Sequence, residues 1–427
     1  MKKSLKTYIL LWSTQSLSAL GSGLTGYALV LWLYTQSGSA LKTALLSVCS
    51  YAPYVLMSIF AGALSDRWNK KATMLLCDLA AALSTVAVLV LIKTGSLEVW
   101  HLYLINALNG LMNTVQQPAA EVAATMLIPE DQYQRTSGLR SFSQSLNSIL
   151  TPVIATALFT LAGIDTVIAV DLTTFAVAFF ALLFLIRIPE PERSESENEP
   201  LLKAAGKGLK WLKQNPLILN LILFLACINL IASIYDAALP AMVISKSGET
   251  ALGVVNTCVG IATLIGSAIV TLLPAPKNRV RAICAALLLS MSTENFFLAF
   301  GSNTLLWSAG AVLGWLSIPY MNANMDVIFR KTIPGEMQGR VYSCRNALQF
   351  FTIPVGFFAG GVLVDEVFEP LMANVSADGL LTTLFGTGKG SGAAFLFFCI
   401  GVIGAAVCVG FWFALRKYRW SDDRVTK

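Results

Sequence analysis

Charged residues and histidine are scarce in this sequence. Only 13% of the 427 residues are charged and one is histidine, His101, whereas 56% are hydrophobic. An average soluble domain has about 25% charged residues, and a soluble core cannot absorb such an apolar excess. The composition therefore indicates a protein that faces a lipid bilayer. A single histidine cannot build a metal cluster, so we expect no bound metal and no cofactor.

The sequence also lacks the motifs of several functional classes. Its eight cysteines include no C-x-x-C pair, and "FGTGKGSG" lacks the G-x-x-x-x-G-K-[ST] spacing of a phosphate loop. The sequence contains no motif that combines a nucleophile with a base, as an enzyme would need. It also shows no ring of like charges of the kind that a channel would normally carry. A membrane-embedded enzyme or a channel is thus a weaker alternative to a transporter, and an ATP-driven pump is not supported.

Twelve apolar stretches are long enough to span a bilayer, which takes ~20 residues in a helix. We expect an all-α membrane protein with twelve transmembrane helices. The expected spans are residues 8–35, 41–64, 72–93, 99–124, 137–162, 166–187, 217–243, 252–275, 280–300, 305–329, 340–365 and 392–416.

The positive charges predict the orientation of these spans. With the N-terminus inside, the inner segments hold 26 Lys and Arg residues and the outer segments hold four, namely Lys42, Lys93, Lys246 and Lys389. Because Lys and Arg in short loops stay on the cytoplasmic side, we expect a multi-pass protein of the inner cell membrane with both termini cytoplasmic. The net charge of +6 then requires no nucleic-acid partner. The first apolar run is too long for a signal peptide, and we expect it to be the first helix.

A long inner connection divides the chain into two halves. We expect an N-terminal six-helix bundle at residues 1–188, a cytoplasmic linker at 189–216 and a C-terminal six-helix bundle at 217–427. The first part of the linker is rich in Ser, Pro and acids, which is typical of a flexible segment. In its second part, apolar residues recur at helical spacing between lysines, which predicts an amphipathic helix on the inner leaflet.

The two halves contain a weak repeat at an offset of 205 residues. "EVAATMLIPEDQYQRTSGLRSFSQ" aligns with "DVIFRKTIPGEMQGRVYSCRNALQ". The aligned polar pairs include Glu121 with Asp326, Arg140 with Arg345, and Gln144 with Gln349. Pseudo-symmetric six-helix halves are the architecture of one large class of secondary transporter, with the substrate near the midplane between them.

The loop after the second span carries a recognisable signature. "GALSDRWNKK" resembles the G-x-L-x-D-R-x-G-R-K motif of the major facilitator superfamily, with Asn69 in place of the second Gly and Lys70 in place of the Arg. "GSA", "LIPEDQ", "TPVIATAL" and "VIAVD" are similar to the macrolide-efflux branch of its drug:proton antiporters. However, the fourth span has no Arg, which many drug antiporters use.

This resemblance implies a monomeric exporter in the lipid bilayer that works by alternating access. It would exchange protons for a small-molecule substrate, a bulky amphipathic drug such as a macrolide. A siderophore or lipid-like metabolite is the alternative substrate.

Charged residues at the inner ends of the spans are candidates for a latch between the halves. The motif acid Asp66 can interact with the N-terminus of the eleventh helix, which stabilises an anion by ~0.3–1 kcal/mol. The alternative is an exposed residue paired with its neighbour Arg67. We expect Glu121 and Asp326 to pair with nearby loop cations. The candidate latch residues are Gly62, Asp66, Arg67, Lys70, Lys71, Glu121, Arg140, Asp326 and Arg345.

Three acids are expected within spans as candidates for the proton or substrate site. They are Asp236, Asp171 and Glu294. A carboxylate inside a span costs ~2.5–3.5 kcal/mol on insertion scales, so such residues usually face a cavity. All three lie toward outer ends, and contact with the outer headgroups is the alternative. Asp236 is the first choice because we expect Pro240 to break its helix. The aromatic candidates for the pocket are Tyr27, Trp315 and Tyr320.

The expected topology can be tested with single cysteines in a cysteine-free background. A cysteine at position 389 should react with a membrane-impermeant maleimide in intact cells, and one at position 207 should react only after permeabilisation, because 26 of 30 positive charges are assigned to the inside. The opposite labelling pattern at either position would overturn the orientation.

Overall fold

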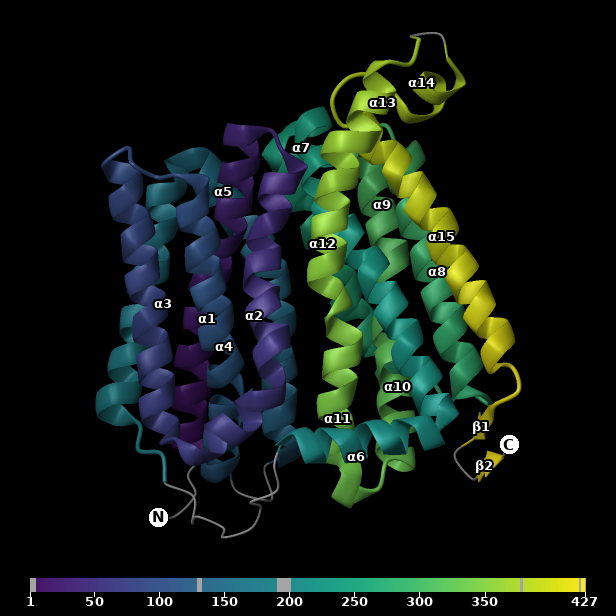
Figure 1. Ribbon diagram of the computed structural model, residues 1–427. Helices are drawn as coiled ribbons and strands as arrows, with labels where there is room; N and C mark the ends of the chain where they lie inside the picture. The colour runs from purple at the N-terminus through teal and green to yellow at the C-terminus, as the bar shows by residue number, and fades with distance from the viewer. Residues whose placement is uncertain (1–4, 129–132, 190–200, 377–378, 422–423, 427) are drawn as a thin grey trace. The chain divides into compact units, whose positions relative to one another are not determined.

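The computed structural model describes residues 5–128, 133–189, 201–376, 379–421 and 424–426, and these are almost entirely helical (Figure 1). The first half of the chain forms six elements. They are α1 (Leu5–Ser37), α2 (Ala40–Arg67), α3 (Lys70–Lys93), α4 (Val99–Leu127), α5 (Tyr133–Phe180) and the π-helix η2 (Ala181–Leu185).

The rest of the chain begins with a short helix and ends with a small hairpin. Its elements are α6 (Leu201–Gln214), α7 (Pro216–Leu272), α8 (Arg279–Phe300), α9 (Thr304–Trp315), α10 (Ile318–Thr332), α11 (Gly335–Phe350), α12 (Thr352–Val362), the π-helix η3 (Leu363–Phe368), α13 (Glu369–Ala373), α14 (Leu380–Phe385), α15 (Ser391–Leu415), β1 (Arg419–Ser421) and β2 (Arg424–Thr426). The two strands pair antiparallel.

Nine segments of the described residues are helical, long and apolar enough to cross a membrane. Two of them each contain two helices joined at a kink, at Gly163 in α5 and at Gly248 in α7, both with φ 78°. At 1.5 Å per residue a straight α7 would be about 85 Å long, far beyond the ~30 Å hydrocarbon core. If the kinked helices α5 and α7 each cross the membrane twice, and the more polar α4 crosses it once, the nine segments together with α4 provide the twelve expected crossings.

The kink in α7 corrects one sequence expectation. Pro240 does not break the helix, which continues through it and kinks at Gly248 instead. A positive φ suits Gly because it has no Cβ, whereas Pro fixes φ near −65°, a value that a helix tolerates.

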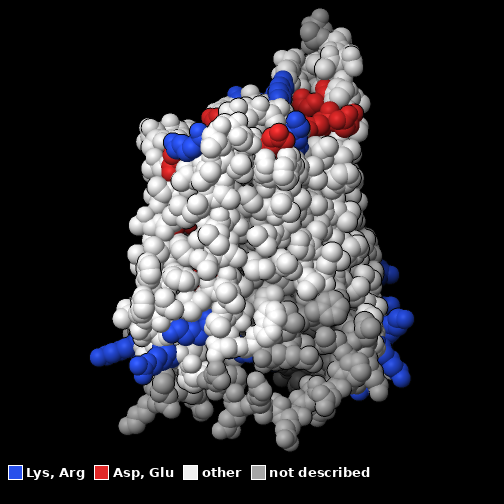
Figure 2. Space-filling model, turned by 60° about the vertical axis from the view of Figure 1, so that its left-hand side comes forward, with Lys and Arg blue, Asp and Glu red and all other residues white. Residues whose placement is uncertain are grey.

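Nearly all charged side chains on the visible face lie at the ends of the helices (Figure 2). The broad band between these ends is almost free of charged side chains. Large apolar side chains such as Leu76, Leu83 and Val90 of α3 are exposed. This pattern is the one that a protein surrounded by lipid requires.

The chain divides into two compact units. Unit 1 comprises residues 1–36 and 46–201, and unit 2 comprises residues 37–45 and 202–427. The beginning of α2 therefore belongs to unit 2, although the rest of that helix belongs to unit 1.

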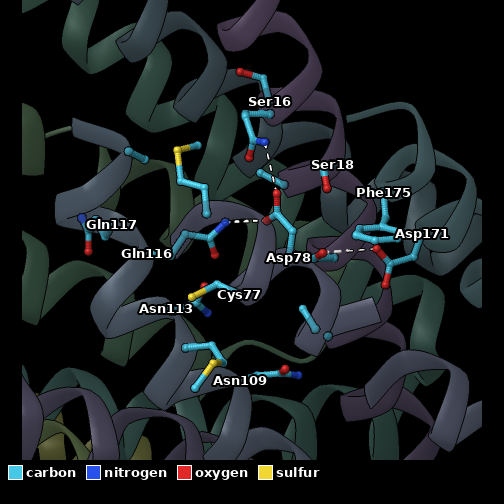
Figure 3. A pocket seen from close by; sticks show the side chains of 18 of the residues that line it. Ser16, Ser18, Cys77, Asp78, Asn109, Asn113, Gln116, Gln117, Asp171 and Phe175 are labelled. Atoms are coloured by element: carbon cyan, nitrogen blue, oxygen red, sulfur yellow. Dashed lines mark hydrogen bonds between the residues drawn. The ribbon is translucent and has the colours of Figure 1, made fainter. Parts of the chain in front are cut away.

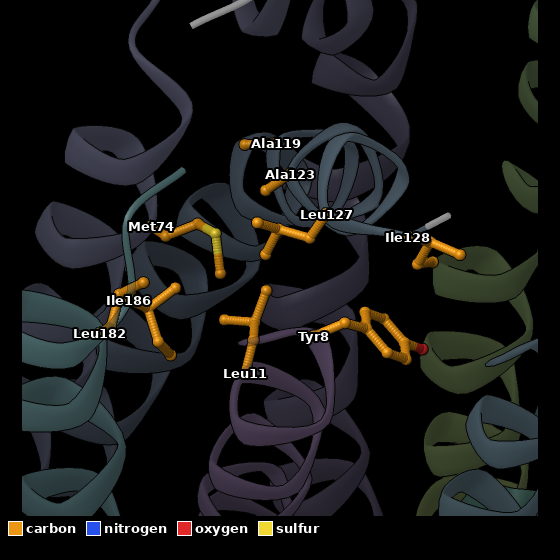
Figure 4. Packing of buried hydrophobic residues seen from close by; sticks show 9 residues of the cluster. All are labelled: Tyr8, Leu11, Met74, Ala119, Ala123, Leu127, Ile128, Leu182 and Ile186. Atoms are coloured by element: carbon orange, nitrogen blue, oxygen red, sulfur yellow. The ribbon is translucent and has the colours of Figure 1, made fainter. Parts of the chain in front are cut away.

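Small and apolar residues bring the helices of unit 1 together. Figure 4 shows Leu11 of α1, Met74 of α3, Leu127 of α4 and Leu182 of η2 in one buried cluster. Elsewhere in the unit, a Cβ added to Gly110 of α4 would lie 2.0 Å from the main-chain oxygen of Ser50 in α2. Such close backbone contact is typical of helix pairs that lack a water-driven hydrophobic force.

Unit 2 has an aromatic core and carries α6 on one side. Phe224, Trp307, Phe329 and Phe397 are among its fully buried side chains. The helix α6 runs nearly perpendicular to α12 in Figure 1, with its Leu212 completely buried. Its lysines 207, 210 and 213 are exposed.

A carboxylate in unit 2 caps the first turn of α2. Asp365 of η3 accepts hydrogen bonds from the main-chain nitrogens of Ala40 (3.0 Å) and Leu41 (2.9 Å) and from Ser39 Oγ (2.6 Å). Lys389 Nζ donates to the main-chain oxygen of Gly38 (2.7 Å). The carboxylate thus satisfies donors that a helix N-terminus leaves open, and its charge matches the dipole there.

The packing at Gly110 predicts a stability difference between two glycine substitutions. Gly110→Ala should lower the free energy of unfolding by ~1–3 kcal/mol, because the added methyl group meets backbone. Gly410→Ala in α15 is the matched control, since nothing lies within 4 Å of its added Cβ. Thermal unfolding of the purified protein in detergent would measure both. Equal midpoints for the two variants would contradict the close α2–α4 contact.

Candidate functional site

Unit 1 encloses a pocket of about 660 Å³ between α1, α3, α4 and α5 (Figure 3). Apolar side chains such as Leu11 and Phe175 line part of its wall. The remainder of the wall carries hydroxyl, amide and carboxyl groups from these four helices. A cavity of this size is typical of small-molecule sites.

Asp78 is the first of two buried carboxyl groups in this pocket. It lies in the first half of α3 and is 9% exposed. Gln15 Nε2 of α1 donates to its Oδ2 (3.3 Å), and Gln116 Nε2 of α4 donates to its Oδ1. Two carboxamides from neighbouring helices therefore hold this side chain (Figure 3).

Asp171 of α5 is the second buried carboxyl group, with 4% exposure. Its partners are hydroxyls: Ser22 Oγ of α1 donates to Oδ1 (3.2 Å), and Thr85 Oγ1 of α3 lies 3.4 Å from Oδ2. Gly21 permits this approach of α1, because a Cβ there would lie 3.0 Å from the Asp171 Cα atom.

Neither buried acid forms an ion pair with any cation in the described part of the chain. The ion pairs found there join Lys93 with Asp165 and Arg140 with Glu121 at 2.6 Å. Asn109 Oδ1, also in the pocket wall, is buried and accepts no hydrogen bond from the described residues. The pocket wall therefore contains two acids and one acceptor that lacks a donor among the described residues, an arrangement that suits a cationic, hydrogen-bonding ligand.

Unit 2 contains a separate buried acid, Glu294 of α8. It is 3% exposed and accepts a hydrogen bond from Trp315 Nε1 (2.7 Å). Gly314 gives it room, because a Cβ there would lie 2.7 Å from the Glu294 Cβ atom. Tyr235 and Asp236 of α7 lie near enough to act on Glu294 electrostatically. Two of the expected acids and one expected aromatic residue thus share one neighbourhood.

The other expected pocket residues differ in their surroundings. Asp236 is exposed, whereas Asp171 and Glu294 are buried. Tyr27 packs against the apolar cluster of Leu24 and Ala28. The main-chain oxygen of Tyr320 accepts a hydrogen bond from Asn324. None of the expected aromatic residues lines the 660 Å³ pocket.

Two lysines of the charged signature, Lys70 and Lys71, lie at the start of α3. Lys71 Nζ donates to the main-chain oxygens of Leu183 (3.0 Å) and Ile186 (2.8 Å), so it binds the carbonyl end of η2. Lys70 is buried, and its Nζ donates to the main-chain oxygen of Trp68 (3.2 Å). The surroundings of Gly62 and the side chains of Asp66 and Arg67 lie outside what the structure describes.

Each unit contains one of the two acid–arginine pairs that align at the offset of 205 residues. In unit 1, Glu121 binds Arg140 at 2.6 Å at the pocket wall. In unit 2, Asp326 and Arg345 line one cavity and attract each other electrostatically. Arg345 also donates from Nε to Gln349 Oε1 (3.1 Å). The repeated residues thus have similar partners in both units.

Asp78 is a further acid within the spans, in addition to the three that were expected from the sequence. The signal was available, since Asp78 interrupts the apolar run "TMLLCDLAAALS" of the expected third helix. Its partners Gln15 and Gln116 could not be inferred, because they come from two other helices.

Comparisons with known proteins agree with this architecture. The family model of the Major Facilitator Superfamily matches residues 11–275. Macrolide efflux protein A of Streptococcus pyogenes is 23% identical over 367 residues, covering 85% of this chain and 90% of that protein. Enterobactin exporter EntS of Salmonella choleraesuis is 21% identical over 372 residues, covering 86% of this chain and 87% of that protein. The solved nucleoside transporter NupG aligns with a TM-score of 0.66 at 12% identity, covering 97% and 100% of the two chains.

The hydrogen bond from the half-buried indole of Trp315 to the buried Glu294 predicts a stability effect. Trp315→Phe should lower the free energy of unfolding by ~1–3 kcal/mol, because Glu294 loses a donor in a buried site. Trp100→Phe is the matched control, since the Trp100 indole donates to Glu98 at an exposed position (2.8 Å). Its loss should change stability by less than ~1 kcal/mol, since water replaces the bond. Thermal unfolding in detergent measures both, and equal effects would mean that Glu294 does not depend on the indole.

Proposed function

Because the chain belongs to the Major Facilitator Superfamily, we propose that it is a secondary exporter that exchanges protons for a bulky, amphipathic, cationic drug. Macrolides are the leading candidates, since efflux proteins for macrolides are among its relatives. We propose the inner cell membrane as its location, with both termini cytoplasmic and a monomer as the working unit.

The observation that carries this proposal is the pocket of unit 1. It holds Asp78 and Asp171 without a cation paired to either among the described residues. A positively charged drug supplies the missing countercharge, and the apolar wall receives its hydrophobic part. Charge complementarity of this kind also disfavours a substrate with net negative charge.

Proton exchange can supply enough free energy for export. Exchange of one proton for one monocation moves no net charge, so a pH difference drives it. One pH unit corresponds to ~1.4 kcal/mol, which supports a tenfold concentration ratio. The coupling requires a carboxyl group that binds a proton when the drug leaves. The candidates are Asp78, Asp171, Asp236 and Glu294.

The charged loop residues support a gating role in the same cycle. Lys71 joins the start of α3 to the end of η2, and the Glu121–Arg140 pair lies at the pocket wall. We propose that Asp66 adds a contact to the N-terminus of α11 in one state of the cycle. An exporter of a siderophore or lipid-like metabolite is the second candidate, favoured by the similarity to the enterobactin exporter.

Drug accumulation in cells tests the proposal. Cells that express the wild type should accumulate several-fold less labelled erythromycin than cells with empty vector, and a protonophore should abolish the difference. Asp78→Asn and Asp171→Asn should each restore accumulation to at least half of the empty-vector level. Asp165→Asn is the control, because it removes an exposed acid that pairs with Lys93 outside the pocket.

The same cells can be tested with a siderophore panel. Export of a siderophore without any effect on erythromycin would replace the leading substrate by the second candidate. Export that persists with the protonophore would remove proton exchange, and full activity of both pocket variants would move the site to Glu294 or Asp236.

A further inference from the structure

The two buried acids of the pocket have hydrogen-bond partners of different chemistry. Resting on the proposed function, we infer that Asp171 carries the exchanged proton and that Asp78 stays ionised and binds the cationic group of the substrate. The inference depends on which partners can form hydrogen bonds with a carboxyl group in both its charged and its neutral form.

The partners of Asp78, as they are oriented, are hydrogen-bond donors only. Gln15 and Gln116 each direct Nε2 at one of its two oxygens. An amide nitrogen donates but cannot accept. A proton on Asp78 would find no acceptor in either amide nitrogen, and one glutamine would have to turn its Oε1 toward the acid to accept it. Two donors stabilise the charged form of a carboxyl group, so this donor set favours Asp78 as a carboxylate.

The partners of Asp171 can form hydrogen bonds with both its charged and its protonated form. A hydroxyl group can donate one hydrogen bond and also accept. Thr85 Oγ1 lies 3.4 Å from Asp171 Oδ2 and 3.2 Å from the main-chain oxygen of Ala81 one turn earlier in α3. When Asp171 is charged, Thr85 donates to Oδ2.

When Asp171 takes up a proton, the direction of these bonds reverses. The proton adds to Oδ2 and the charge of the side chain changes from −1 to 0. Asp171 then donates to Thr85 Oγ1, and Thr85 donates to the Ala81 oxygen instead. Ser22 can adjust at Oδ1 in the same way. Only hydroxyl hydrogens rotate, so both states keep their hydrogen bonds without a change in the packing of α1, α3 and α5.

The other titratable groups of the pocket do not compete for this role. Among the described residues that line it, these are Tyr8, Cys77, Glu121 and Arg140. Glu121 is paired with Arg140. Tyr8 directs its hydroxyl to the main-chain oxygen of Thr136 (3.4 Å), and Cys77 is a thiol next to Asp78. The charge of an exported monocation at Asp78 is then balanced by the proton that returns on Asp171.

Two transport assays separate the roles of these acids. Purified protein is reconstituted in liposomes, and tetraphenylphosphonium, a lipophilic monocation, is the probe. Exchange of labelled for unlabelled probe at equal pH requires binding but no proton transfer. Accumulation driven by a pH difference requires both. The wild type and the control Asp165→Asn should perform both reactions.

The two acid variants should differ. Asp171→Asn should keep exchange within about twofold of the wild type and lose at least tenfold in pH-driven accumulation. Asp78→Asn should lose at least tenfold in both reactions. The reverse result, with exchange retained in Asp78→Asn and lost in Asp171→Asn, would overturn the assignment, as would full pH-driven accumulation in Asp171→Asn. A wild type that transports no probe at all would instead remove the proposed cationic substrate.

A hydroxyl variant keeps the inference testable if Asp171→Asn does not fold. Thr85→Val has nearly the same shape but cannot exchange hydrogen-bond direction with Asp171. It should reduce pH-driven accumulation several-fold with exchange unchanged, and Thr85→Ser should restore it. Normal accumulation in Thr85→Val would contradict the role of the hydroxyl. Size-exclusion chromatography checks that each variant is folded.

Discussion

The absence of water from the hydrocarbon core governs this structure, because every polar group there needs a partner within the protein. Hydroxyl side chains meet this requirement locally: Thr114 donates to the Gly110 oxygen and Ser84 to the Ala80 oxygen, each one turn earlier. The buried acids meet it through other helices. Asp78, Asp171 and Glu294 each depend on a donor from a neighbouring helix, so the position of these acids and the packing of the helices are determined together.

Most of the fold could be predicted from the sequence because membrane-spanning segments are recognised by length and composition. The ~20-residue requirement located the helices without knowledge of their packing. α4 is the most polar of the expected spans because its amides face the pocket. The kinks of α5 and α7 fall in two of the expected connections, at Gly163 between residues 162 and 166 and at Gly248 between residues 243 and 252.

The candidate site was harder to predict, because its chemistry arises between helices. Asp171 and Glu294 were identified as acids in apolar runs, but the sequence could not show that hydroxyls surround one and an indole binds the other. Asp78 was missed, and its two glutamines lie 63 and 38 residues away along the chain. The Glu121–Arg140 pair could be predicted from the internal repeat, because Asp326 and Arg345 have the same spacing in the sequence. Its part in gating remains a proposal.

The cap on the first turn of α2 gives that helix a mechanical role. Residues 37–45 belong to unit 2 and residues from 46 onward belong to unit 1, yet α2 is one continuous helix from Ala40 to Arg67. Hydrogen bonds to a charged group contribute ~1.5–3 kcal/mol each, so the three at Asp365 resist detachment of this end. Pro53 interrupts the internal hydrogen bonds of the same helix further along. Because Pro53 weakens the helix while Asp365 holds its first turn, α2 can bend near Pro53 without breaking the hydrogen bonds of that turn.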